Sequence, residues 1–332
     1  MASREENVET RQDAQRRRSA PVSDFESWYI RAYTYMEVGV SPMTREVPLA
    51  RRVPRWAAPL VARLAQDRPS VLTRGDIAGY LHEMSPGRGV DATVRDLVRL
   101  GWLVSSHLRG VWSFVPPGES VIVDPYLDLR AWRAKDPALV YALAGEAAAW
   151  HLGYLDRRFD GPVSIWLPGG VRPPSGIRPF LKVLGLDWSQ AAAGDLGPSR
   201  VLLRRRHLDL TAWANTFHAF GPEALLVQLA ARPASFLPWG DLVAHLGDLT
   251  KDCELDRLHA LLAGQSASAW QRASYLLHVG GSMKHAREVL AARPFDRFVH
   301  ASLGSGPDRE YSREFGVTDH LVSPILLQIG KA

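Results

Sequence analysis

The chain has 332 residues, 46% of them hydrophobic and 11 of them tryptophan, which predicts a folded protein of about two domains. Its single cysteine, Cys253, excludes an internal disulfide and a cysteine-rich metal site, and suits a reducing cytoplasm. No apolar run reaches the length of a membrane span and no secretory signal is visible, so we expect a cytoplasmic protein without a membrane role.

The net charge of +5 comes from one segment. Between Arg51 and Arg109, ten arginines stand against five acidic residues, so this segment has a balance of +5 and the rest of the chain sums to zero. A basic module on a neutral body is typical of DNA-binding proteins. Residues 1–50 begin with a polar and charged stretch, and we expect them to be a disordered tail, either a native arm or a non-native extension.

Residues 51–117 show the pattern of three helices and a hairpin. The apolar positions recur at helical spacing, and they define three inner faces: Trp56, Leu60, Val61 and Leu64; Ile77, Tyr80 and Leu81; Val94, Leu97 and Val98. Thr73 with Asp76 predicts a capping box, Asp91 an N-cap, and Gly101 a C-terminal glycine. Two apolar strands meet at a turn of Arg109 and Gly110. This order predicts a winged helix-turn-helix.

The basic side chains of this module are the candidate DNA contacts. They are Arg51, Arg52, Arg55, Arg74, Arg88, Arg95, Arg99, His107 and Arg109. Arg95 and Arg99 lie on the outer face of the third helix, where guanidinium groups fork onto guanine or onto phosphates. His107 and Arg109 lie on the wing, where contacts to the DNA backbone are usual. The alternative is a solvated charged face, in which both arginines of the third helix pair with the acidic residues beside them.

Residues 118–332 read as a larger mixed domain. We expect helices at 127–134, 136–155, 221–231, 239–249, 255–262, 267–278 and 283–292, and strands at 163–167, 181–184 and 201–203. The last forty residues read as strand and loop. The fold class is therefore α/β (α+β), a winged helix followed by a larger mixed domain.

A series of landmarks gives the chain a family resemblance. After the basic module come Asp124-Pro125-Tyr126, the stretch from Trp150 to Tyr154, a helix start from Gly221 to Leu226, and the stretch from Gln271 to Leu277. In this order, over residues 54–331, they resemble the AbiEi family of type IV toxin–antitoxin antitoxins in its actinobacterial form. The tail of residues 1–50 lies outside the resemblance.

The resemblance implies a function and two partners. Family members bind operator duplex DNA through the N-terminal winged helix and repress their own operon, and the C-terminal domain is implicated in antagonising a nucleotidyltransferase-like toxin. Gln271 and Arg272, on the polar side of a predicted helix, are the candidate toxin contacts, with a plain solvated face as the alternative. The oligomeric state is left open.

Two other functions are kept as alternatives. The first is a ligand-sensing winged-helix transcription regulator unrelated to a toxin. The second is a nucleic-acid enzyme that docks through the winged helix, but neither a phosphate-binding glycine loop nor a G-x-S-x-G nucleophile elbow occurs in the sequence. We therefore expect no catalytic residue, no cofactor and no metal ligand.

Overall fold

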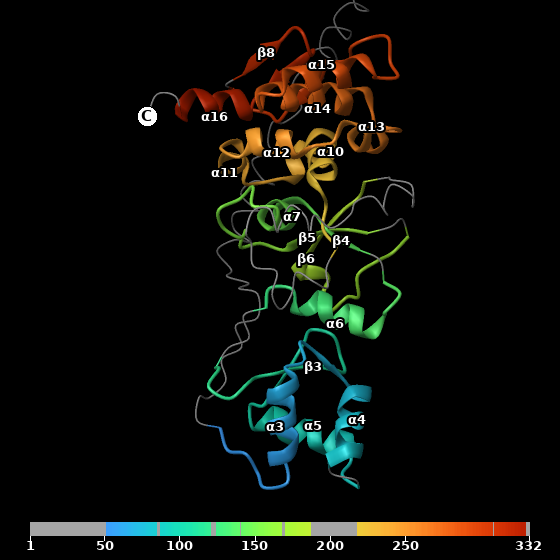
Figure 1. Ribbon diagram of the computed structural model, residues 1–332, viewed down its shortest axis with the longest axis vertical. Helices are drawn as coiled ribbons and strands as arrows, with labels where there is room; N and C mark the ends of the chain where they lie inside the picture. The colour runs from blue at the N-terminus through green and yellow to red at the C-terminus, as the bar shows by residue number, and fades with distance from the viewer. Residues whose placement is uncertain are drawn as a thin grey trace, which may run out of the picture. The chain divides into compact units, whose positions relative to one another are not determined.

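A computed structural model describes residues 51–84, 87–120, 124–139, 141–167, 170–186, 218–307 and 309–329. Helices alternate with small sheets along these ranges, so the predicted mixed α/β class is confirmed (Figure 1). The expected tail of residues 1–50 and the expected strand at 201–203 lie outside the described residues. Residues Thr44–Ala332 form one compact unit, and the domain boundary expected after residue 117 stays a prediction.

The first described part is a module of three helices and a small antiparallel sheet. Its elements are α3 (Ala58–Asp67), β1 (Leu72–Thr73), α4 (Arg74–Met84), α5 (Val90–Arg99), β2 (Leu103–Ser105) and β3 (Val111–Phe114). Strand β3 lies between β1 and β2 and runs antiparallel to both. This is the element order of winged-helix domains, and the DNA-binding role that such a domain implies stays a prediction.

Short sequence signals start and end the helices of this module. Thr73 and Asp76 cap α4 reciprocally, because the Thr73 hydroxyl donates to the Asp76 carboxylate at 2.7 Å and the Asp76 N–H donates back at 3.3 Å. Gly101 follows the end of α5 with a φ of +75°, the left-handed value of a C-terminal glycine. The expected cap at Asp91 is wrong, since Gly89 holds the N-cap position without a side-chain bond.

The middle of the chain holds a second sheet. Its elements are α6 (Leu127–Lys135), β4 (Ala142–Leu143), α7 (Gly145–His151), β5 (Val163–Trp166), the 3-10 helix η1 (Arg178–Phe180) and β6 (Leu181–Leu184). Strand β5 is central, with β4 antiparallel and β6 parallel to it.

The long helix expected over residues 136–155 is wrong. Strand β4 and the single short helix α7 take its place, and Gly145 between them has a φ of +51°. A Cβ at Gly145 would lie 3.1 Å from the Gln228 side chain and 3.2 Å from that of Ser164, so these neighbours would have to shift, and the positive φ also disfavours any other residue there. The alanine residues fit this crowded site because their side chains are small. An alanine-rich run is also typical of a helix, so the sequence pattern does not distinguish the two.

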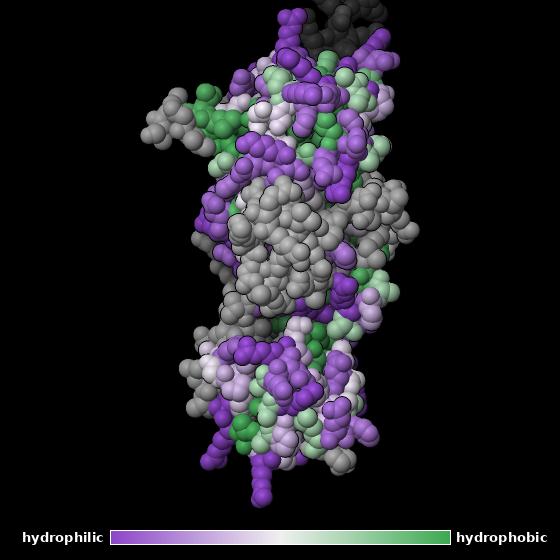
Figure 2. All heavy atoms as spheres, viewed as in Figure 1, coloured by the Kyte–Doolittle hydropathy of each residue, from purple (hydrophilic) through white to green (hydrophobic). Residues whose placement is uncertain are grey.

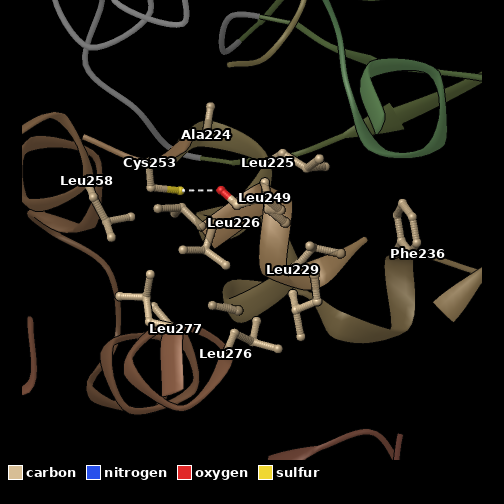
Figure 3. Packing of buried hydrophobic residues seen from close by; sticks show 14 of the residues in the cluster. Ala224, Leu225, Leu226, Leu229, Phe236, Leu249, Cys253, Leu258, Leu276 and Leu277 are labelled. Carbon is tan, nitrogen blue, oxygen red and sulfur yellow. Dashed lines mark hydrogen bonds between the residues drawn. The ribbon is translucent and has the colours of Figure 1, made fainter. Parts of the chain in front are cut away.

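The helical half follows. It comprises α10 (Pro222–Ala231), the 3-10 helix η3 (Pro233–Ser235), α11 (Trp239–Val243), α12 (Leu246–Asp252), α13 (Leu255–Leu262), α14 (Ala267–Val279) and α15 (Met283–Ala291). The helix expected at 239–249 is divided into α11 and α12. Helix α10 is buried along nearly its whole length, and Figure 3 shows its leucines packed beside Leu276 and Leu277 of α14.

The end of the chain adds a third sheet and a helix. Strands β7 (Ala301–Leu303), β8 (Glu310–Ser312) and β9 (Val317–Asp319) form the sheet, with β9 in the middle. The sequence did not predict the final helix α16 (Val322–Ile329), on which Leu326 and Leu327 are exposed. Apolar residues gather in Figure 2 at the place where Figure 1 labels α16. In the described part of the chain, every helix is too short or too polar to cross a bilayer.

Candidate nucleic-acid interface

Helix α5 presents two arginines to solvent. Val94 and Leu97 point from its inner face into the core of the module. Arg95 and Arg99 project from the outer face, and 75% of the Arg99 side chain is exposed. Arg95 has neither an ion-pair nor a hydrogen-bond partner among the residues that the structure describes. The helix therefore presents two guanidinium groups. That of Arg95 has no partner among the described residues, and that of Arg99 is largely exposed.

Arginines engage both acidic residues of α5. Asp96 pairs with Arg88 and with Arg99, and its Oδ1 lies 3.0 Å from the Arg99 guanidinium. Asp91 pairs with Arg74 at 2.9 Å, in an ion pair whose two side chains are both about two-thirds exposed. The alternative interpretation, in which both exposed arginines of α5 are paired within the helix, holds for Arg99 only. The acidic charge of α5 is thus offset locally.

Arg88 stabilises the module through contacts with its other residues. Its guanidinium lies 3.4 Å from the centre of the Trp56 ring and donates to the Thr93 hydroxyl as well as to Asp96. A guanidinium group that lies over an indole ring and donates hydrogen bonds to two other side chains stabilises the fold. Arg88 is therefore placed as a structural residue, unlike the exposed DNA contact that we expected.

Arg51 is also turned inward. Its guanidinium donates to four main-chain carbonyls, those of Gly101 (2.8 Å), Val115 (2.9 Å), Pro116 and Glu119. The same group lies over the Trp102 ring, 4.3 Å from its centre. These contacts use most of its five N–H donors, so Arg51 closes the module instead of extending a basic arm. Arg52 and Arg55, the other two arginines of that arm, are exposed.

The wing divides into an exposed turn and a docked base. Arg109 is exposed at the turn, next to Gly110 with its φ of +80°. His107 points the other way: its Nδ1 lies 2.8 Å from Oδ2 of Asp128 on α6, and its ring stacks on Phe180 with centroids 4.0 Å apart. The expectation of a DNA contact from His107 is not supported by this placement, because the ring is held against the second part of the chain.

The apolar residues around the wing continue this docking. Leu108 and Val111 belong to the same buried cluster as Tyr126, Leu129 and Ile165 of the middle of the chain. The wing is thus part of two cores, and its base is fixed by packing as well as by the His107 ring.

The two candidate toxin contacts lie inside the protein. Gln271 has 0% exposed surface; its Nε2 donates to the carbonyls of Val299, Phe315 and Gly316, and its Oε1 accepts from the Val299 N–H. A fully buried amide cannot contact a partner in this fold, so that prediction is wrong. Polar side chains of α14 form hydrogen bonds to the loops that cross this helix. Helical periodicity in the sequence does not tell whether a polar face meets such loops or solvent.

Arg272 is held in the same way. Its guanidinium donates to the Ala230 carbonyl, to the Ser302 carbonyl at 3.0 Å and to the Ser268 hydroxyl at 3.3 Å. Burial lowers the pKa of this guanidinium below its usual value. Arg272 therefore ties the end of α10 to strand β7, and it is not the exposed contact that we expected.

The sequence did not reveal a buried polar centre between α7 and the second sheet. Glu146 accepts hydrogen bonds from the Ser164 hydroxyl (2.5 Å), the Lys182 ammonium (2.9 Å) and the Leu237 N–H (3.1 Å). Ser164 and Lys182 are direct partners on the parallel strands β5 and β6. The residues lie far apart in the sequence and follow no motif, so no spacing signal was available. The centre satisfies its own charges and joins the sheet to the helical half.

Comparisons with known proteins agree with the architecture. A family model described as the AbiEi antitoxin C-terminal domain matches residues 141–279. The chain is similar to the crystal structure of the RV2827C protein from Mycobacterium tuberculosis, with 47% sequence identity and a TM-score of 0.79. The match covers 88% of this chain and 99% of that protein. A search of curated proteins found no match. The family model covers α7, the second sheet and the helices through α14, and on these grounds the chain belongs to the AbiEi antitoxin family.

Proposed function

We propose that this antitoxin binds operator duplex DNA through residues 51–115, represses its own operon, and antagonises a nucleotidyltransferase-like toxin encoded beside it. The observation that carries the DNA-binding part is the state of α5. Arg95 and Arg99 are exposed there, while the acidic side chains of the helix are already engaged by arginines. This leaves positive charge directed outward on the helix that reads DNA in a winged helix.

The exposed arginines of the module divide into two expected roles. Arg95 and Arg99 suit base readout, because a guanidinium forks onto the O6 and N7 of guanine in the major groove. Arg52, Arg55 and Arg109 lie outside this helix and suit phosphate contacts, which position the protein without reading sequence. Arg74 joins the second group if its exposed pair with Asp91 opens.

The test compares operator with scrambled duplex DNA, using the region upstream of the antitoxin gene as the operator probe. Arg95→Ala and Arg99→Ala in the full chain should each cost about 1–3 kcal/mol on the operator and less on scrambled DNA. Arg109→Ala should weaken both DNAs alike. Arg63→Ala is the matched control, since Arg63 is an exposed arginine of α3 held by Asp67.

Two results would contradict this assignment. One is the same loss from Arg63→Ala as from Arg95→Ala, which would reduce the binding to bulk charge. The other is unchanged operator binding when Arg95 and Arg99 are both replaced, which would remove α5 from the interface.

Toxin antagonism is assigned to the part of the chain after the module. The family model supports this, because its match at residues 141–279 excludes residues 51–115. The full chain with Arg95→Ala and Arg99→Ala should therefore lose operator binding and still protect cells that express the neighbouring toxin from an independent promoter. Protection that disappears together with operator binding would show that antagonism acts through repression.

A further inference from the structure

The third sheet has an outer face without large apolar side chains. The register places Tyr311, Thr318 and Ser302 opposite one another in one row across β8, β9 and β7. The alternate residues Val317 and Leu303 are fully buried on the inner face. The outer row therefore consists of one aromatic ring beside two small hydroxyl residues. Tyr311 is 63% exposed and lies on the edge strand β8.

Two arginines flank β8. Arg309 immediately precedes the strand and Arg313 immediately follows it, so one arginine lies at each end of the strand that carries Tyr311. Both arginines are exposed, and neither has an ion-pair partner among the residues that the structure describes.

The nearby acidic residues that the structure describes face the other way or are engaged. Glu310 is opposite Asp319 on the inner side, and Glu314 pairs with Arg287 at 2.8 Å. Asp319 is fully buried and accepts from the Tyr275 hydroxyl at 2.9 Å. Strand β8 therefore carries an exposed tyrosine with an arginine at each end, and the described row of Tyr311, Thr318 and Ser302 contains no carboxylate.

We propose that the exposed surface at β8, defined by Arg309, Tyr311 and Arg313, binds single-stranded nucleic acid. A base would stack on the Tyr311 ring, and the flanking phosphates would pair with the two guanidinium groups, the combination that single-strand binding surfaces use. A peptide strand added to the β8 edge would need only main-chain hydrogen bonds, so these side chains favour a nucleic acid over a peptide. The surface is separate from the module of residues 51–115.

The test measures binding of fluorescein-labelled, unstructured 12-nucleotide RNA and DNA to the full chain. All variants carry Arg95→Ala and Arg99→Ala together with Arg52→Ala, Arg55→Ala and Arg109→Ala, so that the proposed base and phosphate contacts of the module are absent. Tyr311→Ala should weaken binding about tenfold, and Tyr311→Phe should retain it, because stacking needs the ring but not the hydroxyl. Replacing Arg309 and Arg313 by alanine should lower the slope of log affinity against log salt by about 1.4, which corresponds to two phosphates at about 0.7 each.

The controls separate this surface from general positive charge. Arg232→Ala with Arg257→Ala removes two exposed arginines elsewhere in the helical half and should leave binding unchanged. Circular dichroism of each variant checks the fold. The proposal is overturned if neither 12-mer binds at low salt, if the control pair weakens binding as much as the Arg309 and Arg313 pair, or if Tyr311→Phe loses as much as Tyr311→Ala. Preference for the RNA or the DNA 12-mer would identify the class of strand.

Discussion

At the scale of single residues, long polar side chains hold main-chain groups that have no partner in a helix or sheet. Arg51 does so for carbonyls that follow α5 and β3, Gln271 for the loops before β7 and β9, and Arg272 for the end of α10. A buried carbonyl or N–H left without a partner is costly, which explains why these polar groups lie in the interior. Their loss should therefore affect stability before it affects binding.

Replacing Gln271 by leucine keeps the side-chain volume but removes every hydrogen bond of the amide. The Val299 N–H and the carbonyls of Phe315 and Gly316 would then be buried without that partner. We expect the free energy of unfolding to fall by about 2–4 kcal/mol. Urea denaturation of the full chain measures this.

The control for that prediction is Gln66→Leu, at an exposed position of α3. A surface change of this kind should stay within about 0.5 kcal/mol. A loss for Gln271→Leu no larger than that of the control would mean that the loops bond elsewhere or to water, against the structural role assigned here.

His151 gives the stability a defined pH dependence. It is buried in α7, its ring stacks on Tyr126, and burial lowers its pKa to about 4. In the unfolded chain its pKa is about 6.5, so on acidification the unfolded state takes up a proton that the native state does not. The stabilising contribution is present above about pH 6.5 and is lost as the pH falls toward 4.

The measurable part of this loss is about 2 kcal/mol between about pH 7 and pH 5. His151→Phe keeps an aromatic ring and removes the titration. The unfolding free energies of the two proteins, measured by urea denaturation at both pH values, should therefore differ in their pH dependence by about this amount. Parallel pH profiles for the two proteins would show that His151 is not the group responsible.

At the scale of elements, the wing depends on a close approach of two backbones. A Cβ at Gly176 would lie 2.4 Å from the His107 carbonyl oxygen, a distance that no neighbour can accept without moving. The glycine therefore allows η1 and its preceding turn to approach the base of the wing, where the His107 ring stacks on Phe180.

Gly176→Ala should separate the wing from this contact. We expect a loss of about 1–3 kcal/mol in unfolding free energy from the overpacking, and faster hydrogen exchange of the amides at 106–111. Gly185→Ala is the matched control, because a Cβ there meets nothing within 4 Å and its φ is not positive. If both alanine variants exchange alike at the wing, the contact does not hold the wing in place.

The elements also show what the sequence can and cannot predict. Helices with a strong apolar stripe, such as α5 and α13, appear at the expected residues because burial of one face determines both the pattern and the structure. The prediction of one helix over residues 136–155 is wrong, because the conformation of Gly145 and strand β4 depends on neighbours from β5 and α10. The prediction for Gln271 is wrong for a related reason. A polar residue on a helix gives the same sequence pattern whether it bonds to water or to a buried loop.

Among the candidate DNA contacts, residue type alone could not separate the outward from the inward arginines. Arg88 and Arg51 lie beside tryptophans whose rings they cover, and that contact joins segments of the chain that the spacing of arginines does not connect. Arg95 and Arg99 were placed outward by the helical period of α5 and are exposed. The helical period of α5 was thus a usable signal for its two arginines. On the flanking loops no such signal separates the exposed Arg52, Arg55 and Arg109 from the inward Arg51 and Arg88.

At the scale of the whole molecule, the module and the rest of the chain share buried residues. Leu108 and Val111 pack with Tyr126 and Leu129, and the residues from Thr44 to Ala332 form one compact unit. The module also has a core of its own, formed by its three helices and its sheet. The unfolding of the two parts is therefore expected to be coupled through the wing.

This coupling predicts that DNA bound to the module stabilises helices far from it. At a duplex concentration of about 100 times its dissociation constant, binding stabilises the native state by about 2.7 kcal/mol. If the parts unfold together, hydrogen exchange of the most protected amides of α14 should slow by about a hundredfold on adding duplex DNA. In Gly176→Ala the wing is separated, so that DNA should protect residues 51–115 without slowing exchange in α14. Gly185→Ala should behave like the parent chain. Protection limited to residues 51–115 in the parent chain would show instead that the shared cluster is too weak to couple the two parts. The part of the chain after the module would then keep its stability whether or not DNA is bound.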